Sequence, residues 1–155
     1  MRIGIISDTH GLLRPEAVDA LGGSRLIVHA GDIGGQEILD RLSRIAPVLA
    51  VRGNNDTGDW AMNLPARQTL SVRGSTITVL HDVAELDARS RSRSAVVVSG
   101  HSHKPGYRIE KDVLFFNPGS AGPRRFTLPI AVARLSLGRG APRARIRELT
   151  IPARG

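Results

Sequence analysis

The first eleven residues, MRIGIISDTHG, place a short apolar run, Ile3–Ile6, directly before Asp8 and His10. A run of this length that is rich in isoleucine and free of proline is typical of a buried β-strand. Asp8 and His10 would then lie at the carboxyl end of that strand. In α/β sheets, ligands bind beyond the carboxyl ends of the strands. The opening segment therefore predicts a central strand with a candidate binding site after it.

The same order, an apolar run followed by a polar cluster, recurs four more times. The runs are Leu26–His29, Val48–Val51, Ile77–Leu80 and Val96–Val98, and the clusters after them are Gly31-Asp32, Gly53-Asn54-Asn55-Asp56, His81-Asp82 and Gly100-His101-Ser102-His103. If the strands are parallel, these clusters converge at one edge of the fold. We expect one site built from Asp8, His10, Asp32, Asn54, His81, His101 and His103. His29 lies inside its own run, so we expect a buried histidine that supports the site.

The segments between the first three runs have helical patterns. Arg14–Leu21 carries proline at its second residue, which is a favoured position in the first turn of a helix. Gln36–Ile45 places its apolar residues on one face at helical spacing, and Pro47 follows it. The first fifty residues therefore predict the order β-α-β-α-β.

The rest of the chain reads mainly as β-hairpins. The predicted strand pairs are Thr69–Val72 with Thr76–Leu80, Gly106–Glu110 with Val113–Phe116, and Ile130–Leu137 with Arg143–Ile151. Arg89–Ser94, an alternation of arginine and serine, is interpreted as a solvated helix end or loop. These elements favour an α/β fold in which two mixed β-sheets pack face to face with helices outside, a four-layer α/β/β/α sandwich. The chain has 155 residues, which is the size of one domain, so we expect a single domain over residues 1–155.

Composition limits the classes of function. No stretch approaches the ~20 apolar residues of a membrane span, and the chain opens on a strand pattern rather than a signal peptide, so a cytoplasmic protein without membrane contact is expected. The net charge is +8, and residues 86–155 carry 14 basic and 4 acidic residues. Such a surface attracts phosphorylated substrates or anionic polymers. Aromatic residues make up only 3% of the chain, which disfavours a base-stacking surface.

The types of candidate ligand indicate a metal site. The chain has no cysteine, so a metal must be held by imidazole, carboxylate and amide groups, a set that suits Mn, Fe, Zn, Co or Ni. Seven ligands are too many for one ion and suit two ions that share a carboxylate. Two ions about 3.5–4 Å apart can clamp a phosphoryl oxygen and activate a bridging hydroxide. This chemistry predicts phosphoester hydrolysis.

The ordered motifs also resemble those of a known family. Ser7-Asp8-Thr9-His10-Gly11, Gly31-Asp32, Gly53-Asn54-Asn55-Asp56, His81 and Gly100-His101-Ser102-His103 are similar to the motifs of calcineurin-like metallophosphoesterases. Asn117-Pro118-Gly119-Ser120 follows the last histidine pair, as in the small bacterial and archaeal phosphodiesterases of that superfamily. The resemblance implies two β-sheets between helices and two divalent ions, with manganese preferred.

The resemblance also implies a role for each candidate residue. Asp8, His10 and His103 would hold the first ion, Asn54, His81 and His101 the second, and Asp32 would bridge them. Asp32, Asn54 and His101 are further expected to act in catalysis. Asn117–Ser120 is expected to be a turn that braces the site.

Two positions depart from the family pattern. Many members have a histidine that protonates the leaving group where this chain has Asn55, and relatives often have glycine where it has Asp82. An amide cannot act as a general acid, so we expect a phosphodiesterase for a small or loosely specified diester whose leaving group needs little help. Asp82 could support a ligand histidine.

Several alternatives stay open at this stage. The same site could hydrolyse phosphomonoesters, or the chain could be a non-catalytic scaffold, as some relatives are. Arg89–Arg93 and Arg124-Arg125 could instead bind nucleic acid. A homo-oligomer is a further expectation, because relatives often form one.

Overall fold

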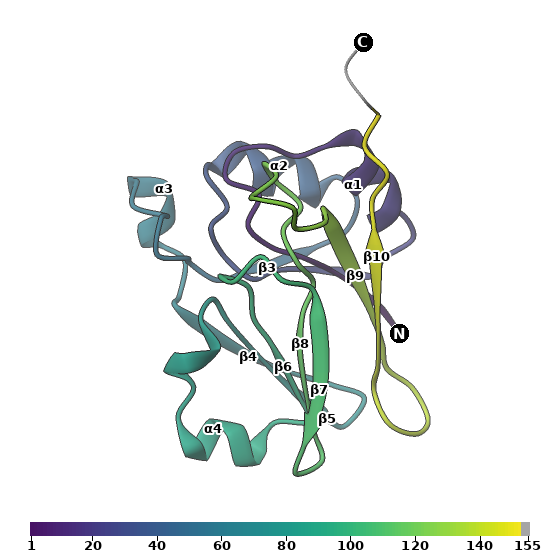
Figure 1. Ribbon diagram of the computed structural model, residues 1–155. Helices are drawn as coiled ribbons and strands as arrows, with labels where there is room; N and C mark the ends of the chain where they lie inside the picture. The colour runs from purple at the N-terminus through teal and green to yellow at the C-terminus, as the bar shows by residue number, and fades with distance from the viewer. Residues whose placement is uncertain (153–155) are drawn as a thin grey trace.

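The computed structural model describes residues 1–152, which form two five-stranded mixed sheets. Strand order is β10-β9-β1-β2-β3 in the first sheet and β4-β5-β6-β8-β7 in the second (Figure 1). The strands are β1 (Arg2–Ile6), β2 (Leu26–His29), β3 (Val48–Ala50), β4 (Arg67–Val72), β5 (Ser75–Leu80), β6 (Val96–Val98), β7 (Gly106–Glu110), β8 (Val113–Asn117), β9 (Ala131–Ser136) and β10 (Arg143–Glu148). The helices are α1 (Pro15–Leu21), α2 (Gln36–Ser43), α3 (Asp59–Met62) and α4 (Ala88–Arg93), with a 3-10 turn over Val83–Glu85.

The strands that precede the candidate ligands are parallel within each sheet. In the first sheet, β1 pairs with β2 and β2 with β3 in parallel, while β9 and β10 add an antiparallel hairpin. In the second sheet, β5, β6 and β8 are parallel, and β4 and β7 pair antiparallel at the two edges. The carboxyl ends of the parallel strands in each sheet therefore share one edge, as the repeated pattern predicted.

The two sheets enclose the main apolar core. Ile5 and Val28 from the first sheet and Val79 and Val98 from the second are fully buried in one cluster between them. Each such side chain contributes about 1.5–3 kcal/mol when it is fully buried. This shared core holds the two sheets in a fixed relative position, which in turn positions the loops at their ends.

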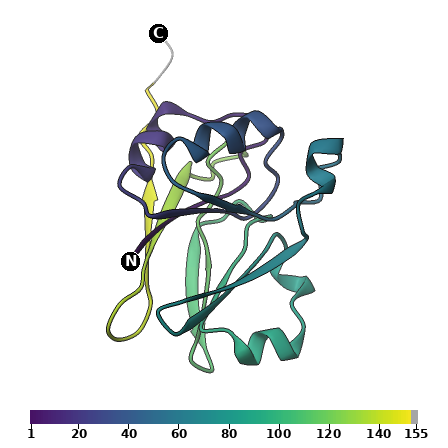
Figure 2. The ribbon, with the colours of Figure 1, turned by 180° about the vertical axis from the view of Figure 1, so that it is seen from behind.

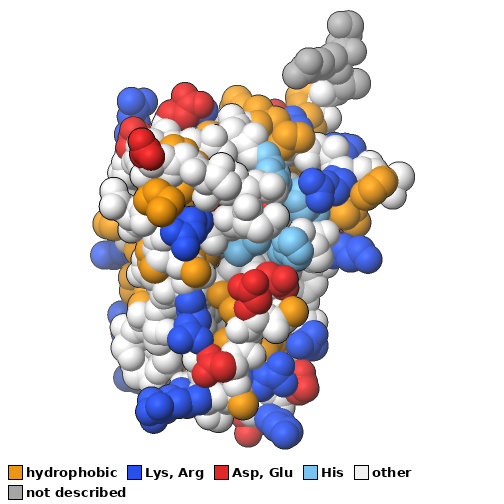
Figure 3. All heavy atoms as spheres, turned by 90° about the vertical axis from the view of Figure 1, so that its left-hand side faces the viewer, with side chains coloured by type: hydrophobic (Ala, Val, Ile, Leu, Met, Phe, Trp, Pro, Cys, Tyr) orange, Lys and Arg blue, Asp and Glu red, His pale blue; other side chains and the backbone are white. Residues whose placement is uncertain are grey.

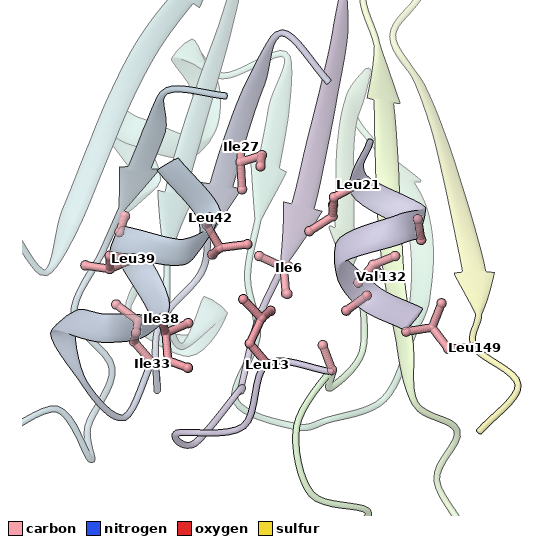
Figure 4. Packing of buried hydrophobic residues seen from close by; sticks show 14 of the residues in the cluster. Ile6, Leu13, Leu21, Ile27, Ile33, Ile38, Leu39, Leu42, Val132 and Leu149 are labelled. Atoms are coloured by element: carbon pink, nitrogen blue, oxygen red, sulfur yellow. The ribbon is translucent and has the colours of Figure 1, made fainter. Parts of the chain in front are cut away.

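Helices α1 and α2 cover the outer face of the first sheet. Figure 4 shows Leu21 of α1 and Leu42 of α2 directed toward Ile6 and Ile27 of the sheet. The prediction of both helices is confirmed, although α2 ends at Ser43 rather than Ile45. The order β-α-β-α-β is therefore correct for the first fifty residues.

The outer face of the second sheet has a thinner cover (Figure 2). Val83 and Leu86 pack on its apolar residues, and the guanidinium groups of Arg91 and Arg108 lie 5.3 and 4.9 Å from the centre of the Phe115 ring. The four-layer sandwich is confirmed, with α4 and the neighbouring turn as its fourth layer. The arginine-serine segment forms most of α4. Within residues 1–152, no helix is long and apolar enough to cross a membrane.

Candidate metal centre

Five of the seven predicted ligands meet at one point between the two sheets. Asp8 and His10 follow β1, Asp32 follows β2, His81 follows β5 and His103 follows β6. The Oδ1 atom of Asp8 lies 3.4 Å from Nε2 of His103 and 3.8 Å from Nε2 of His10. Figure 3 shows histidine side chains grouped on one face of the molecule. Ligand atoms from both sheets are therefore close enough to hold a metal.

The five residues form two adjoining groups that share Asp8. One group contains Asp8, His10 and His103, and the other contains Asp8, Asp32 and His81. In the second group, Oδ2 of Asp32 lies 3.2 Å from Nε2 of His81; it also lies 3.7 Å from Nε2 of His10 in the first group. Both carboxylates therefore lie where they can contact more than one cation.

The other two predicted ligands lie at the rim of this cluster. The His101 ring packs edge-on against His81 with centroids 5.1 Å apart, and its side chain is 48% exposed. Its Nε2 atom lies 3.9 Å from Oδ2 of Asp82. Asn54 is exposed in the loop after β3, and its side chain makes no hydrogen bond within residues 1–152. A hollow of about 350 Å³ beside His101 is also lined by Lys104 and Tyr107.

The backbone at the site has unusual torsion angles. Left-handed φ angles occur at Asp8 (56°), His10 (45°), Asp32 (55°), His101 (72°) and His103 (62°). Non-glycine residues seldom adopt this conformation, although aspartate and histidine tolerate it better than most. Strain of this kind concentrates at functional sites, where the surrounding fold maintains it. The fold thus holds these side chains in place at a cost in backbone energy.

Two glycines allow the loops to approach the carboxylates closely. A Cβ atom at Gly100 would collide with Oγ of Ser7, and one at Gly53 would collide with the backbone nitrogen of Asp32. Because both glycines lack a side chain, the loops after β3 and β6 can pack directly on the loops after β1 and β2.

Hydrogen bonds orient the ligand atoms. Ser7 Oγ donates to Oδ2 of Asp8 at 2.7 Å, which leaves Oδ1 facing the histidines. Asn55 donates to Asp32 twice, from its backbone nitrogen at 2.9 Å and from its side-chain amide at 3.0 Å. His81 Nδ1 lies 2.8 Å from the carbonyl oxygen of Ala30 and donates to it, so Nε2 keeps its lone pair. This pattern is typical of metal-binding histidines.

Buried polar atoms without partners support a cation at this point. Within residues 1–152, Oδ1 of Asp8, Nε2 of His81 and Nδ1 of His103 are buried and make no hydrogen bond. Leaving a buried polar group unpaired costs about 1–3 kcal/mol. A divalent ion would satisfy the first two atoms directly. The residues present therefore fit the metal that the sequence predicted.

The electrostatics of the two carboxylates differ. Burial raises the pKa of Asp8 above its usual value, and the Ser7 hydrogen bond only partly opposes this shift. Burial would also raise the pKa of Asp32, but the nearby His81 imidazole and the hydrogen bonds from Asn55 lower it well below the usual range. For His81, the Asp32 carboxylate 3.2 Å from Nε2 and the hydrogen bond to Ala30 outweigh burial and raise the pKa. A bound cation would favour the ionised form of Asp8.

Asp56, which is buried beside the ligands, holds two of the loops together. Asp56 accepts hydrogen bonds from the backbone nitrogens of Ile33 (3.1 Å), Gly34 (3.1 Å) and Gly53 (2.9 Å). It thereby joins the loop after β2 to the loop after β3. The sequence pattern places Asp56 in a polar cluster but does not indicate this role. Its place three residues after Gly53, in the same cluster, was the only signal.

His29 is buried and supports the site, as predicted. The Thr9 hydroxyl donates to the carbonyl oxygen of Ile33 at 2.7 Å, so it accepts from Nε2 of His29 at 2.9 Å. The backbone nitrogen of Gly31 donates to Nδ1 of His29 at 3.1 Å. Burial lowers the pKa of His29 to about 3, so the imidazole is neutral near pH 7.

The segment Asn117–Ser120 braces the site, which confirms its predicted role. The Asn117 amide donates to the carbonyl oxygen of Gly100 at 2.9 Å, and Ser120 Oγ donates to the carbonyl oxygen of Asp8 at 3.0 Å. The segment thus ties β8 to the loops that carry the ligands.

Sequence comparison identifies relatives of this chain. The curated "Probable metallophosphoesterase" of Methanocaldococcus jannaschii is 38% identical over 77% of this chain and 68% of the relative. That of Methanothermobacter thermautotrophicus is 36% identical over 83% of this chain and 82% of the relative.

Solved structures share the fold. An archaeal phosphodiesterase has a TM-score of 0.78 and 23% identity over 95% of this chain and all of that chain. A phosphoesterase from E. coli has a TM-score of 0.71 and 25% identity over 88% of both chains. Vps29 from Entamoeba histolytica in complex with Zn²⁺ has a TM-score of 0.73 and 19% identity over 96% of this chain and 99% of that chain. Residues 1–140 match the model of the calcineurin-like phosphoesterase superfamily domain, and this chain therefore belongs to that superfamily.

Proposed function

We propose that residues 1–155 form one catalytic domain that hydrolyses a small phosphodiester with two bound divalent ions. The observation that carries this proposal is the buried Oδ1 atom of Asp8, which lacks a hydrogen-bond partner and lies 3.4–3.9 Å from the Nε2 atoms of His10, His81 and His103. An unpaired buried carboxylate oxygen that faces three imidazoles is costly without a cation.

The proposal assigns each ligand as the family pattern does. Asp8, His10 and His103 would hold one ion, and Asn54, His81 and His101 would hold the other. Asp32 would be shared by the two ions. Two ions at such a site polarise a phosphoryl oxygen and make water nucleophilic at neutral pH. The oxygen and nitrogen donors suit Mn, Fe, Zn, Co or Ni. The family resemblance favours Mn, and the zinc-bound Vps29 of the same fold makes Zn the second choice.

Asn55 favours diesters over monoesters. Both of its donor groups are engaged with Asp32, so it acts as a positioning residue and supplies no proton to a leaving group. A diester with a good leaving group needs little protonation. The archaeal phosphodiesterase of the same fold supports this assignment, and the hollow beside His101 has room for one arm of a diester.

The test compares metal-stripped and metal-loaded protein on bis(p-nitrophenyl) phosphate and p-nitrophenyl phosphate. We expect Mn to restore turnover, the diester to be the better substrate, and Asp32→Asn to abolish turnover. Asp112→Asn, in the exposed turn between β7 and β8, is the matched control and should behave like the wild type. Unchanged turnover in Asp32→Asn would exclude the proposal, and faster turnover of the monoester would favour a phosphomonoesterase. Protein that retains no metal and shows no turnover would favour a scaffold.

A further inference from the structure

The loop between Ser120 and Ile130 projects from the edge of the metal centre. Its base is closed by a bridge between these two residues, with the backbone nitrogen of Ala131 donating to the carbonyl oxygen of Ser120 at 3.0 Å. Pro123 through Thr127 are exposed. We call residues 121–129 the rim loop.

The rim loop is attached to the segment that carries the first ligands. Ala121 donates its backbone hydrogen bond to the carbonyl oxygen of Ser7 at 3.1 Å. Gly122 packs so closely on Thr9 that a Cβ atom there would collide with the Thr9 carbonyl oxygen. The Arg14 guanidinium donates to the carbonyl oxygen of Gly122 at 3.3 Å. The start of the loop is therefore fixed relative to Asp8.

The two adjacent arginines of the rim loop differ in their contacts. Arg124 Nη1 donates to the carbonyl oxygen of Leu128 at 3.1 Å, which closes the loop on itself. The Arg125 guanidinium forms no ion pair or hydrogen bond in the part of the chain that the structure describes. Arg125 is therefore an exposed cation three positions after Gly122, the residue that packs on Thr9 beside the ligands.

Phe126, the next residue, has two unusual properties. Its side chain is 86% exposed, more than any other large apolar residue within residues 1–152. Its φ angle is 54°, in a turn closed by the bond from the Leu128 nitrogen to the Arg125 carbonyl oxygen at 3.1 Å. A bulky residue at positive φ is an outlier, and such strain is common at ligand-binding sites. The fold thus presents an aromatic ring to solvent at an energetic cost.

We propose that the rim loop selects phosphodiesters that carry a planar aromatic group on one arm, such as an aryl or nucleoside ester. Arg125 contacts the phosphoryl oxygens, and Phe126 stacks on the ring of that arm. A guanidinium forms strong charge-assisted bonds to phosphate, and exposed aromatic side chains stack on planar rings. The proposal rests on the phosphodiesterase function proposed above and adds the class of substrate.

The first test measures the binding of two phosphonates to the Mn-loaded protein by calorimetry, which needs no turnover. We expect phenylphosphonate to bind about tenfold more tightly than methylphosphonate, because a stacked ring typically contributes at least this much. Phe126→Ala should bring the ratio of the affinities for phenylphosphonate and methylphosphonate close to one, and Phe126→Tyr should preserve this ratio. Ile109→Ala removes another exposed apolar side chain, on β7, and should leave the ratio unchanged.

The second test addresses Arg125. Arg125→Ala should weaken the binding of both phosphonates about tenfold. It should also raise the KM for bis(p-nitrophenyl) phosphate with little change in kcat. Arg125→Lys should recover part of the lost affinity. Arg139→Ala is the matched control, because Arg139 lies in the turn at the far end of β9. It should match the wild type, which excludes a general loss of positive charge as the cause.

The outcomes separate the two proposals. Equal affinity of the wild type for both phosphonates, or a ratio that survives Phe126→Ala, overturns the rim-loop proposal even if diesters are hydrolysed. A phenyl preference that depends on Phe126, in a protein that hydrolyses no diester, supports the rim loop and overturns the proposed function.

Discussion

Replacing His29 with glutamine should flatten the dependence of stability on pH. The folded chain lowers the pKa of His29 from 6.5 to about 3 through burial of the neutral ring between Thr9 and Gly31. Below pH 6.5 the unfolded chain takes up a proton at this position, whereas the folded chain does so only near pH 3. The free energy of unfolding therefore falls as the pH falls through this window. The shift corresponds to about 5 kcal/mol, since each pKa unit is worth ~1.36 kcal/mol.

His29→Gln keeps polar atoms for Thr9 and Gly31 but does not titrate. Between pH 7 and pH 4.5, the stability advantage of the wild type over this variant should shrink by roughly 2–3 kcal/mol. Other groups titrate in both proteins, so their effects cancel in the difference. The assay is urea unfolding at several pH values in the presence of a chelator. Fluorescence of Trp60, the only tryptophan, reports on unfolding because it packs against the core under α1 and α2.

The reasoning is refuted if the stability difference between the two proteins changes by less than about 0.5 kcal/mol over this pH range. Linkage predicts a much larger change. So small a change would mean that the His29 ring is solvated or protonated in the folded protein, and that it does not hold Thr9 and Gly31 as a neutral donor and acceptor.

Three further predictions concern the loops and the metal. Asp56→Asn should destabilise the protein by about 2 kcal/mol in urea unfolding and weaken Mn binding, because an amide cannot accept all three backbone bonds; an unchanged midpoint would contradict this role. Phe126→Gly should raise stability by about 1 kcal/mol while removing the phenyl preference, because glycine tolerates positive φ; a loss of stability would show that the ring has a structural role. Mn at one hundred times its Kd should stabilise the wild type by ~2.7 kcal/mol but leave Asp8→Asn unchanged, and an equal thermal shift in both would place the ion elsewhere.

The parts that could be predicted from the sequence are those that depend on local pattern. Apolar runs such as Ile3–Ile6 and Val96–Val98 have few alternatives to buried strands, and polar residues after them must lie at the strand ends. Parallel pairing then brings these ends together within each sheet, and the predicted face-to-face packing of the two sheets brings the two edges together. The convergence of Asp8, Asp32 and His103 could be predicted for this reason.

Other features depend on contacts that no local pattern reveals. Asp8 belongs to both ligand groups because Ser7 and Gly100 set the orientation of its carboxylate, and Gly100 lies 92 positions later in the chain. The four residues of α3 are too few for a helical period to show. The positive φ of Phe126 results from the closed rim loop, since phenylalanine itself disfavours it.

The division of the ligands between the two sheets has a consequence for assembly. Asp8 belongs to the first sheet and His103 to the second, 95 positions later in the chain, so the centre cannot form until the sheets have docked. Contacts between residues this distant in sequence form slowly, because a long loop must close first. A cation held by both residues would act as a crosslink that opposes separation of the sheets. Metal uptake would therefore follow docking, and removal of the metal should speed unfolding more than it slows folding.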